Sequence, residues 1–438
     1  MTEAPTGQSG RLLGESPLHW RQIVAIALCV ALNAIDGFDV LSISFASPGI
    51  AAEWGIDRAA LGVVLSMELI GMAAGSVVLG QTADRIGRRP TALACLIIMS
   101  AGMLTTTQVG GIVELTLTRL LTGFGIGGML ATTNALVAEY ANDRWRSAAI
   151  TVMAAGYPMG AIAGGSIASA LLAAGNWRDV FWLGAGMSAA LIPLIPLLLP
   201  EPPDAIVRRN PPDALARVNR SLRALGHSLI RALPKLAPET RKAGARELFS
   251  PSLRSVTLLL TLAYFLHIMT FYFILKWVPK IVVDMGYSPS AAGGVLVWAN
   301  VGGLLGSLLF AALSLRVALR GLVIGSMVAA TVFVTWFGQG QSDLVSMSWA
   351  VALGGVFGNA GVVGLYALIA AMFPTQVRAG GTGFVIGVGR GGAALSPILA
   401  GLLFAAGLGL PVVAAMIASA SLLASIAVFA LPKRHDVP

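Results

Sequence analysis

Two aspartates, Asp36 and Asp39, lie in the middle of an apolar segment that runs from about residue 23 to about residue 47. A helix of roughly 20 apolar residues is long enough to cross a bilayer. A carboxylate at that depth costs about 2.5 to 3.5 kcal/mol on insertion scales, so an acid kept there is expected to have a function. Residues three apart share one helical face, where two acids can hold a proton between them. The pair predicts a proton-coupling site with Asp36 as the first candidate, while Asp39 is alternatively a structural residue.

Among the other charged residues inside apolar segments, Arg119, Arg390 and Glu68 are candidates for a function. Arg119 and Arg390 carry guanidinium groups, whose flat pair of donors matches a carboxylate. An organic anion inside a membrane needs such a cation, so both arginines are candidate substrate ligands. Two alternatives stay open: Arg390 pairs permanently with a protein acid, or Arg119 serves proton movement. Glu68 is either a third proton-coupling residue or an acid that faces the external mouth.

Aromatic and polar residues in later apolar segments are candidates for the wall of a substrate pocket. An aromatic ring would receive the apolar part of a substrate, and an amide or hydroxyl would orient it. A lone histidine in a membrane is more often a packing or hydrogen-bonding residue, and this alternative applies to His267. The candidates are Tyr264, His267, Trp298, Asn300, Asn359 and Tyr366.

The segments that carry these residues belong to a strongly apolar chain. Of its 438 residues 56% are hydrophobic and only 11% are charged, and the mean hydropathy is +0.81. Such a composition indicates a protein with many membrane spans. We expect twelve spans, at residues 22–47, 59–82, 90–109, 112–138, 147–174, 178–199, 254–279, 290–313, 317–338, 344–372, 379–405 and 408–431.

The basic residues indicate how these spans are oriented. With both termini on the cytoplasmic side, most of the 29 Lys and Arg also fall on that side. This positive-inside bias explains the net charge of +9 without a nucleic-acid partner. The exceptions are Arg58, Arg178, Lys276 and Lys280 outside, with Arg119 and Arg390 within spans.

A proline-rich and basic break after the sixth span divides the chain into two sets of six spans. The break is either regulatory or a linker, whose amphipathic stretch would rest on anionic headgroups. Two sets of six suggest an internal duplication. We expect a cytoplasmic tail at 1–21 that is not a secretory signal, a first six-helix half at 22–199, a cytoplasmic linker at 200–252, a second half at 253–431 and a cytoplasmic tail at 432–438.

The loop between spans 2 and 3 reads GQTADRIGRRP from Gly80 to Pro90. It resembles the signature loop of the major facilitator superfamily, G-x-x-x-D-R-x-G-R-R. The run RLLTGFGIGG from Arg119 to Gly128 resembles the span 4 motif of the same family. In that family the loop belongs to a charge network that gates alternating access. By this resemblance the candidate gating residues are Gly80, Asp84, Arg85, Gly87, Arg88, Arg89, Glu139, Arg144 and Arg146.

Shorter motifs indicate a subfamily. The run DGFD at 36–39 resembles the D-G-x-D of aromatic acid:proton symporters, which import acids such as benzoate and 4-hydroxybenzoate. The run GVGRGG around Arg390 is similar to that family as well. The loop SLRVALR at 314–320 departs from it, because it lacks the acid that the family often has there. The resemblance implies an all-α integral membrane protein of twelve transmembrane helices, with two six-helix halves around a central cavity.

These observations predict a secondary transporter that imports an aromatic carboxylate with protons by alternating access, across a bacterial inner membrane. The alternatives are a proton-coupled carrier of a sugar acid or small dicarboxylate, and a multidrug:proton antiporter. Two membrane arginines disfavour cationic drugs. An enzyme is not expected, because nucleotide-binding, metal-spaced and nucleophile motifs are missing from the sequence. The expected partners are a small aromatic anion, protons and the bilayer, with no nucleic acid and no cofactor, and the protein is expected to work as a monomer.

Overall fold

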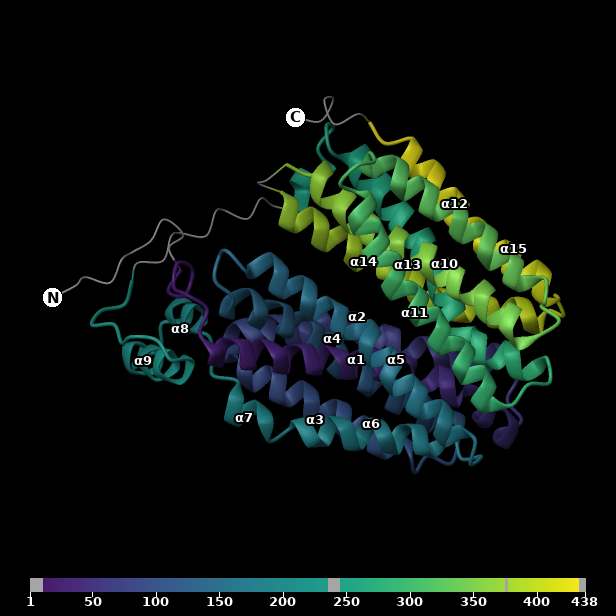
Figure 1. Cartoon of the computed structure of the whole chain (residues 1–438), viewed down its shortest axis with the longest axis horizontal. Coiled ribbons are helices and arrows are strands. Elements are labelled where there is room, and N and C mark those ends of the chain that lie inside the picture. The colour runs from purple at the N-terminus through teal and green to yellow at the C-terminus, as the bar shows by residue number, and fades with distance from the viewer. Residues whose placement is uncertain (1–10, 235–244, 375–376, 433–438) are drawn as a thin grey trace. The chain divides into compact units, whose positions relative to one another are not determined.

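The computed structural model describes residues 11–234, 245–374 and 377–432, and all regular elements within them are helices (Figure 1). Predictions for residues 1–10, 235–244, 375–376 and 433–438, which include parts of both tails and of the linker, lie outside the described residues. The long helices are α1 (Trp20–Trp54), α2 (Arg58–Ile86), α3 (Arg88–Thr106), α4 (Ile112–Tyr140), α5 (Arg146–Leu172), α6 (Arg178–Leu191), α10 (Arg254–Asp284), α11 (Pro289–Leu313), α12 (Leu319–Gly338), α13 (Leu344–Met372), α14 (Arg378–Ala405) and α15 (Leu410–Phe429). The short ones are α7 (Leu194–Leu198), α8 (Pro203–Arg209), α9 (Ala214–Leu225) and a 3-10 turn at Ala245–Phe249.

Twelve helical segments in the described part of the chain are long and apolar enough to span a membrane, which confirms the predicted number. Several extend beyond the predicted limits, since α1 alone has 35 residues. The sixth span, Arg178–Leu198, is broken into α6 and α7. Pro193 lies at the break, where its ring and missing N–H prevent a continuous helix.

The contacts divide the chain into two compact units, and four of the five boundaries between them fall inside helices. Unit 1 comprises Met1–Val40, Ile70–Ala161 and Phe181–Pro238. Unit 2 comprises Leu41–Leu69, Ile162–Val180 and Glu239–Pro438. The later parts of α1 and α5 and the earlier part of α2 therefore belong to unit 2 with α10–α15. The division into two six-helix halves stays a prediction.

Unit 1 is built on two close helix pairs. A methyl group on Gly37 of α1 would lie 2.0 Å from the carbonyl oxygen of Tyr157 on α5, so only glycine fits there. Asn33 of α1 also contacts α5, because its side-chain amide donates a hydrogen bond of 2.7 Å to the Met153 carbonyl. The second pair is α2 and α4, where a methyl group on Gly75 would lie 1.9 Å from the Phe124 carbonyl. Small residues at such contacts let membrane helices approach closely.

Unit 2 repeats this arrangement. Here α10 packs on α14, and a methyl group on Gly392 would lie 2.1 Å from the Phe265 carbonyl. The helices α11 and α13 form the other close pair, where a methyl group on Gly302 would lie 2.0 Å from the Ala352 carbonyl. Spans 1 and 5 thus pair as spans 7 and 11 do, and spans 2 and 4 as spans 8 and 10. An internal duplication predicts this repetition.

At one end of unit 2 the earlier part of α2 contacts α10 and α14, and the later part of α5 contacts α11. A methyl group on Gly62 of α2 would lie 2.4 Å from the Pro397 carbonyl on α14. Arg58, at the start of α2, forms an ion pair of 2.8 Å with Asp284 at the end of α10. A methyl group on Gly293 of α11 would lie 2.3 Å from the hydroxyl of Ser169 on α5. Helices from both predicted halves are in contact at this end.

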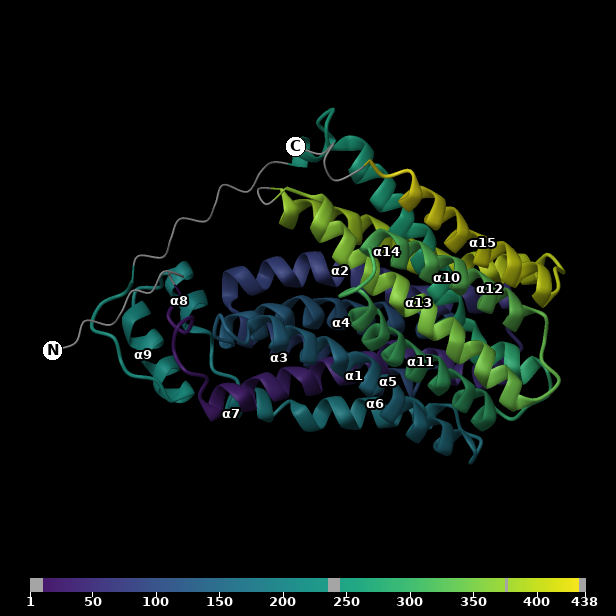
Figure 2. The ribbon, with the colours of Figure 1, turned by 45° about the horizontal axis from the view of Figure 1, so that its top comes forward.

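The linker helices α8 and α9 lie beyond the start of α1, at one end of unit 1 (Figure 2). The apolar stripe of α9 is buried in the protein, since Val218, Leu222 and Leu225 are at most 2% exposed. This differs from the prediction that an amphipathic stretch rests on headgroups. The residues are amphipathic as expected, but α8 and the neighbouring parts of unit 1 cover the apolar face.

We expect Gly37→Ala to destabilise the protein, because its methyl group would overlap the α5 backbone. Overpacking of this kind costs about 1–3 kcal/mol or more. The matched control is Gly186→Ala in α6, which has open space at that position and should be neutral or slightly stabilising because alanine favours the helix. The heat-unfolding midpoint of each purified variant in detergent checks this. Equal midpoints for the two variants would contradict the tight α1–α5 contact.

Candidate functional site

The two aspartates of α1 are both completely buried. Neither carboxylate oxygen of Asp36 accepts a hydrogen bond from any residue that the structure describes. Asp39 is buried to the same extent and interacts with neighbouring groups. Gly37, between them, holds this part of α1 against α5. Asp36 is thus an acid in an apolar place without the donors that would stabilise its charge.

Arg119 of α4 is the buried cation of unit 1 that the sequence predicted. Its Nη2 donates to the hydroxyl of Thr106 at 2.6 Å and to that of Thr122 at 3.1 Å. Its guanidinium lies over the ring of Phe181, 4.7 Å from the centroid. These contacts hold the group between α3, α4 and α6.

Asp39 and Arg119 share neighbours on α3 and α6. A methyl group on Gly184 would lie 3.1 Å from Asp39 Oδ1 and 3.3 Å from Met103 Sδ. Arg119 Nη1 is 3.5 Å from the same sulfur. The sequence could not anticipate this, because four separate helices bring the residues together. The structure thereby gathers one acid and one base of the predicted site within unit 1.

Arg390 of α14 lies among tyrosines in unit 2. Tyr264, Tyr272 and Tyr366 are near enough to interact electrostatically with its guanidinium. The hydroxyls of Tyr264 and Tyr366 are 3.0 Å apart, and their ring centroids 5.7 Å apart. Two of the predicted wall residues therefore accompany Arg390. Tyr272 was not among the predicted site residues, although it follows Tyr264 at a spacing that keeps both tyrosines on neighbouring positions of one α10 face.

The glycines beside Arg390 have a different neighbour from the one expected. The sequence suggested that they let a ligand come close to the guanidinium. A methyl group on Gly389 would lie 2.2 Å from the ring of Tyr264, and Gly392 faces the α10 backbone. Around Gly387 the space is open. Two of these glycines thus make room for α10, which places Tyr264 beside Arg390.

Four other predicted wall residues have different surroundings. His267 is buried, and its ring nitrogens pair with the Ser421 hydroxyl and with the Gly358 carbonyl, the latter at 2.8 Å, which is the packing role weighed from the sequence. Asn300 donates to its own helix at Leu296, whereas Asn359 joins α13 to α11 through Gly303 and Ser307. Trp298 is 52% exposed. Their part in a pocket stays a prediction.

Glu68 of α2 and Lys276 of α10 form a buried ion pair. Oε2 and Nζ are 3.4 Å apart, and both side chains are 0% exposed. The sequence predicts Lys276 on the outer side and Glu68 at an external mouth or in proton coupling. In the structure the carboxylate of Glu68 and the ammonium of Lys276 pair with each other, and the carboxylate is not exposed to solvent. The sequence signal for this pair was an acid and a base at comparable depths in two different predicted spans.

The loop after α2 belongs to a network of charges at the end of unit 1 where α4 ends. Arg88 forms ion pairs with Asp84 at 2.8 Å and with Glu139 at 3.7 Å. Gly87 has φ +124°, a backbone angle that favours glycine. The methyl group of an alanine there would lie 2.8 Å from Glu201 Oε1. Gly87 therefore lets the loop approach Glu201 closely.

The linker supplies residues to this network that sequence reasoning missed. Glu201 accepts hydrogen bonds from the backbone N–H groups of Arg88 and Arg89, at 2.7 and 2.9 Å, and pairs with Arg209 at 2.7 Å. Arg208 of α8 pairs with Glu139. The linker residues of this network lie in a segment where the sequence shows no recognisable motif, so the sequence did not indicate them. We call the following residues the Glu139–Glu201 network: Asp84, Arg88, Glu139, Glu201, Arg208 and Arg209.

The remaining gating candidates lie apart from these acids. Arg85 and Arg146 are exposed, and Arg144 lies over the ring of Trp145, 5.7 Å from its centroid. Gly80 faces Ala131 of α4, with 3.6 Å available to a methyl group. Of the partners considered for Glu139, the loop arginine Arg88 is the one that the structure brings to it. In the described ranges no three His, Cys, Asp or Glu side chains are grouped as metal ligands.

Comparisons with known proteins agree with this fold. A model of the Major Facilitator Superfamily matches residues 26–299 and 260–438. A gallate transporter of Pseudomonas putida is 30% identical over 427 residues, which are 94% of this chain and 92% of the relative. A 3-(3-hydroxy-phenyl)propionate transporter of Escherichia coli (strain K12) is 30% identical over 438 residues, 99% of this chain and 98% of the relative.

A solved structure of a D-xylose-proton symporter has a TM-score of 0.73 to this chain at 14% identity, and the match covers 94% of this chain and 99% of the symporter. That similarity shows the fold alone. Together the comparisons confirm the predicted fold class and the resemblance to transporters of aromatic acids, rather than to enzymes.

We expect Lys276→Met to destabilise the protein, because it leaves the Glu68 carboxylate buried without its ammonium partner. Removing one member of a buried pair costs about 3–5 kcal/mol. The double variant Glu68→Leu, Lys276→Met should regain much of this loss, since it removes both charges. Heat-unfolding midpoints in detergent measure both effects. A double variant no more stable than Lys276→Met would show that the two charges are not coupled.

Proposed function

The chain belongs to the Major Facilitator Superfamily, and we propose that it imports an aromatic carboxylate together with protons. It is a multi-pass membrane protein with twelve candidate spans. Two relatives that match nearly its whole length are transporters of gallate and of 3-(3-hydroxy-phenyl)propionate. In the proposed orientation both termini face the cytoplasm of a bacterium, in agreement with the positive-inside bias.

The surroundings of Arg390 are the observation that carries the substrate class. A carboxylate would receive two parallel hydrogen bonds from the guanidinium. Tyr264, Tyr272 and Tyr366 gather aromatic faces and hydroxyls around the same group. These rings would contact the ring of an aromatic acid, and their hydroxyls would orient its ring substituents. A small dicarboxylate or a sugar acid would make little use of three rings.

Asp36 is the proposed proton carrier. It is completely buried, and none of the described residues donates a hydrogen bond to it. Ionised Asp36 and Asp39 with one Arg119 would leave an excess negative charge in this part of unit 1. One proton on Asp36 would remove that excess, and burial without described hydrogen-bond donors favours its neutral form. With Asp36 neutral, the charges of Asp39 and Arg119 would balance each other.

The energetics favour inward movement of the anion. One carboxylate entering with more than one proton carries net positive charge, which a membrane negative inside attracts by about 2.3 kcal/mol per charge per 100 mV. The proton gradient adds to this. A carboxylate crossing alone would be opposed by the same potential, so proton coupling is what makes accumulation favourable.

Ion pairs near the ends of the spans are the proposed gates. In this orientation the end of unit 2 where α2 contacts α10 and α14 faces outward, and Glu68–Lys276 and Arg58–Asp284 join the helices there. The Glu139–Glu201 network lies at the cytoplasmic end of unit 1. Alternating access requires the outward contacts to separate when the outer side opens.

We expect Asp36→Asn to abolish gradient-driven accumulation of radiolabelled aromatic acid in proteoliposomes, because the amide cannot carry the proton. Exchange of labelled for unlabelled substrate should survive. The control is Asp57→Asn, an exposed residue whose side chain accepts from the Ala60 N–H as an amide also can. Full accumulation by Asp36→Asn, or wild-type uptake that persists with a protonophore, would refute proton coupling through Asp36.

We expect Arg390→Ala to weaken binding of benzoate-type acids to the purified protein. Loss of a buried charged partner costs about 2 kcal/mol or more, which is roughly a 30-fold rise in Kd. Arg390→Lys should fall between, since it keeps the charge but loses the forked donors. Calorimetric titration measures each Kd, with the exposed Arg254→Ala as control. Wild-type affinity in Arg390→Ala would overturn its role as the carboxylate ligand.

A further inference from the structure

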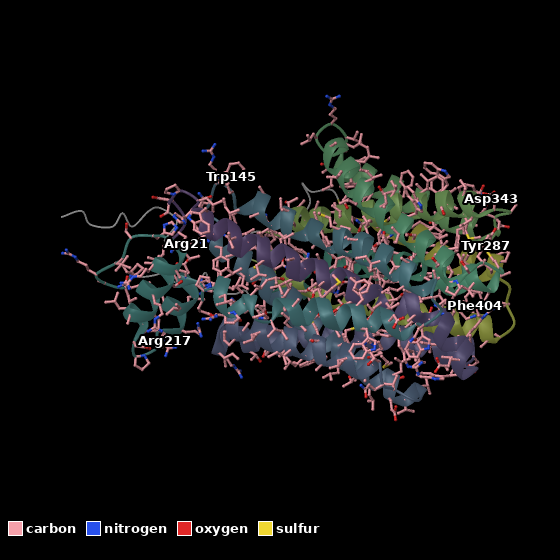
Figure 3. The ribbon with its side chains drawn as sticks, turned by 60° about the horizontal axis from the view of Figure 1, so that its bottom comes forward. Arg21, Trp145, Arg217, Tyr287, Asp343 and Phe404 are labelled. Carbon is pink, nitrogen blue, oxygen red and sulfur yellow. The ribbon has the colours of Figure 1, made fainter. Side chains whose placement is uncertain are left out.

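A pocket of about 690 Å³ lies in unit 1, outside the predicted transport site. It is bounded by the starts of α1 and α3, by α7 and by the linker helices α8 and α9. Figure 3 labels Arg21, at the start of α1, and Arg217, on α9, which both line it. The pocket is separate from the proposed substrate and proton sites, and it shares Glu201 and Arg209 with the Glu139–Glu201 network.

Part of the pocket lining is apolar and is made by the ends of membrane spans. Trp20 begins α1 and is 62% exposed, and Leu197 and Leu198 end the sixth span with exposures of 75% and 39%. Tryptophan at the end of a span is typical of the headgroup level of a bilayer. The exposed leucines continue the apolar surface of the span. This apolar lining therefore lies where acyl chains meet headgroups.

The charged part of the lining is basic. Five guanidinium groups line the pocket together with only two carboxylates, those of Glu201 and Asp213, which leaves an excess of positive charge. Arginine presents donors that match a phosphate as well as a carboxylate. The pocket is thus suited to an anion. The five arginines are Arg21, Arg89, Arg209, Arg217 and Arg220.

Several of these arginines already form hydrogen bonds or ion pairs within the protein, and the others have N–H donors available for a ligand. Arg89 donates to the Pro196 carbonyl at 2.7 Å, and Arg209 pairs with Glu201. Arg217 pairs with Asp213 at 2.7 Å, with both side chains 54% exposed. For Arg220 the described part of the chain provides no hydrogen bond or ion pair. Arg220, on the exposed face of α9, is therefore the arginine of the lining with the most donors available, and the ion pair of its neighbour Arg217 is open to solvent.

The packing of α9 presents these arginines to the pocket. Its apolar residues, including Val218 and Leu222, are buried in unit 1, so the helix cannot turn that stripe toward lipid. The hydroxyl of Ser221 donates a hydrogen bond of 2.6 Å to the Glu201 carbonyl, which fixes the helix to the start of the linker. The basic residues of α9 are left at the surface beside the span ends.

We propose that this pocket binds an anionic phospholipid, with the phosphate against Arg217 and Arg220 and the acyl chains along Trp20 and Leu197. Apolar span ends beside a basic lining match the two parts of such a lipid. A free phosphate or a soluble anion would use the arginines but not the apolar lining. The bound lipid would join the linker helix α9 to the first and sixth spans. This inference does not depend on the identity of the transported acid.

Native mass spectrometry of the full-length protein, with dioleoylphosphatidylglycerol or dioleoylphosphatidylcholine added in detergent, tests the proposal. We expect the wild type to retain more phosphatidylglycerol than phosphatidylcholine. Arg220→Gln should weaken phosphatidylglycerol binding roughly fivefold, as estimated for one arginine near an anionic surface. The matched control Arg223→Gln removes the same charge from an exposed position of α9 outside the pocket lining, and should bind as the wild type does.

Two further comparisons decide between sources of the anion. Glycerol 1-phosphate, which has the headgroup phosphate without acyl chains, should not displace the lipid, and Trp20→Ala should weaken lipid binding. Equal retention of both lipids, equal effects of Arg220→Gln and Arg223→Gln, or displacement by glycerol 1-phosphate would overturn the proposal. Unchanged heat-unfolding midpoints ensure that a loss of binding does not reflect a loss of folding.

Discussion

A charge inside a membrane protein must be compensated by its neighbours, because bulk water is not there to solvate it. Unit 1 surrounds Arg119 with hydroxyls and the ring of Phe181. Unit 2 pairs Lys276 with Glu68 and gathers tyrosines around Arg390. Each cation is thus held by a different chemistry. The arrangement of spans follows from this requirement, since most of the compensating groups come from other helices.

Asp36 is the exception among these charged side chains, because no described residue donates a hydrogen bond to its carboxylate. A carboxylate without hydrogen-bond donors is stable in an apolar place only when it is neutral. Its neighbour Asp39, three residues further along α1, is equally buried and interacts with neighbouring groups. In the proposed function Asp36 is the acid that carries the proton. The anion that accompanies the proton would meet its cation on α14.

Close glycine contacts keep these groups in place. The pairs α1–α5 and α10–α14 each carry a site residue, Asp36 in the first and Arg390 in the second, near a glycine that contacts the partner helix backbone. The two units therefore use the same packing to position opposite charges. At the end of unit 1 where α4 ends, Glu139 and Glu201 connect the loop after α2 to the linker, which makes the linker more than a simple tether.

The sequence alone determined the number of spans, the family and the residues that carry charge into the membrane. These depend on hydropathy and on local motifs such as DGFD and the loop at 80–90, which can be read without knowing any distant contact. Tertiary structure decided the partners. The packed helices pair Glu68 with Lys276 and Arg208 with Glu139. They also place His267 against the Gly358 carbonyl of another helix and Tyr272 near Arg390. Those pairings depend on which helix faces meet, and segments far apart in the chain meet only after the helices have packed.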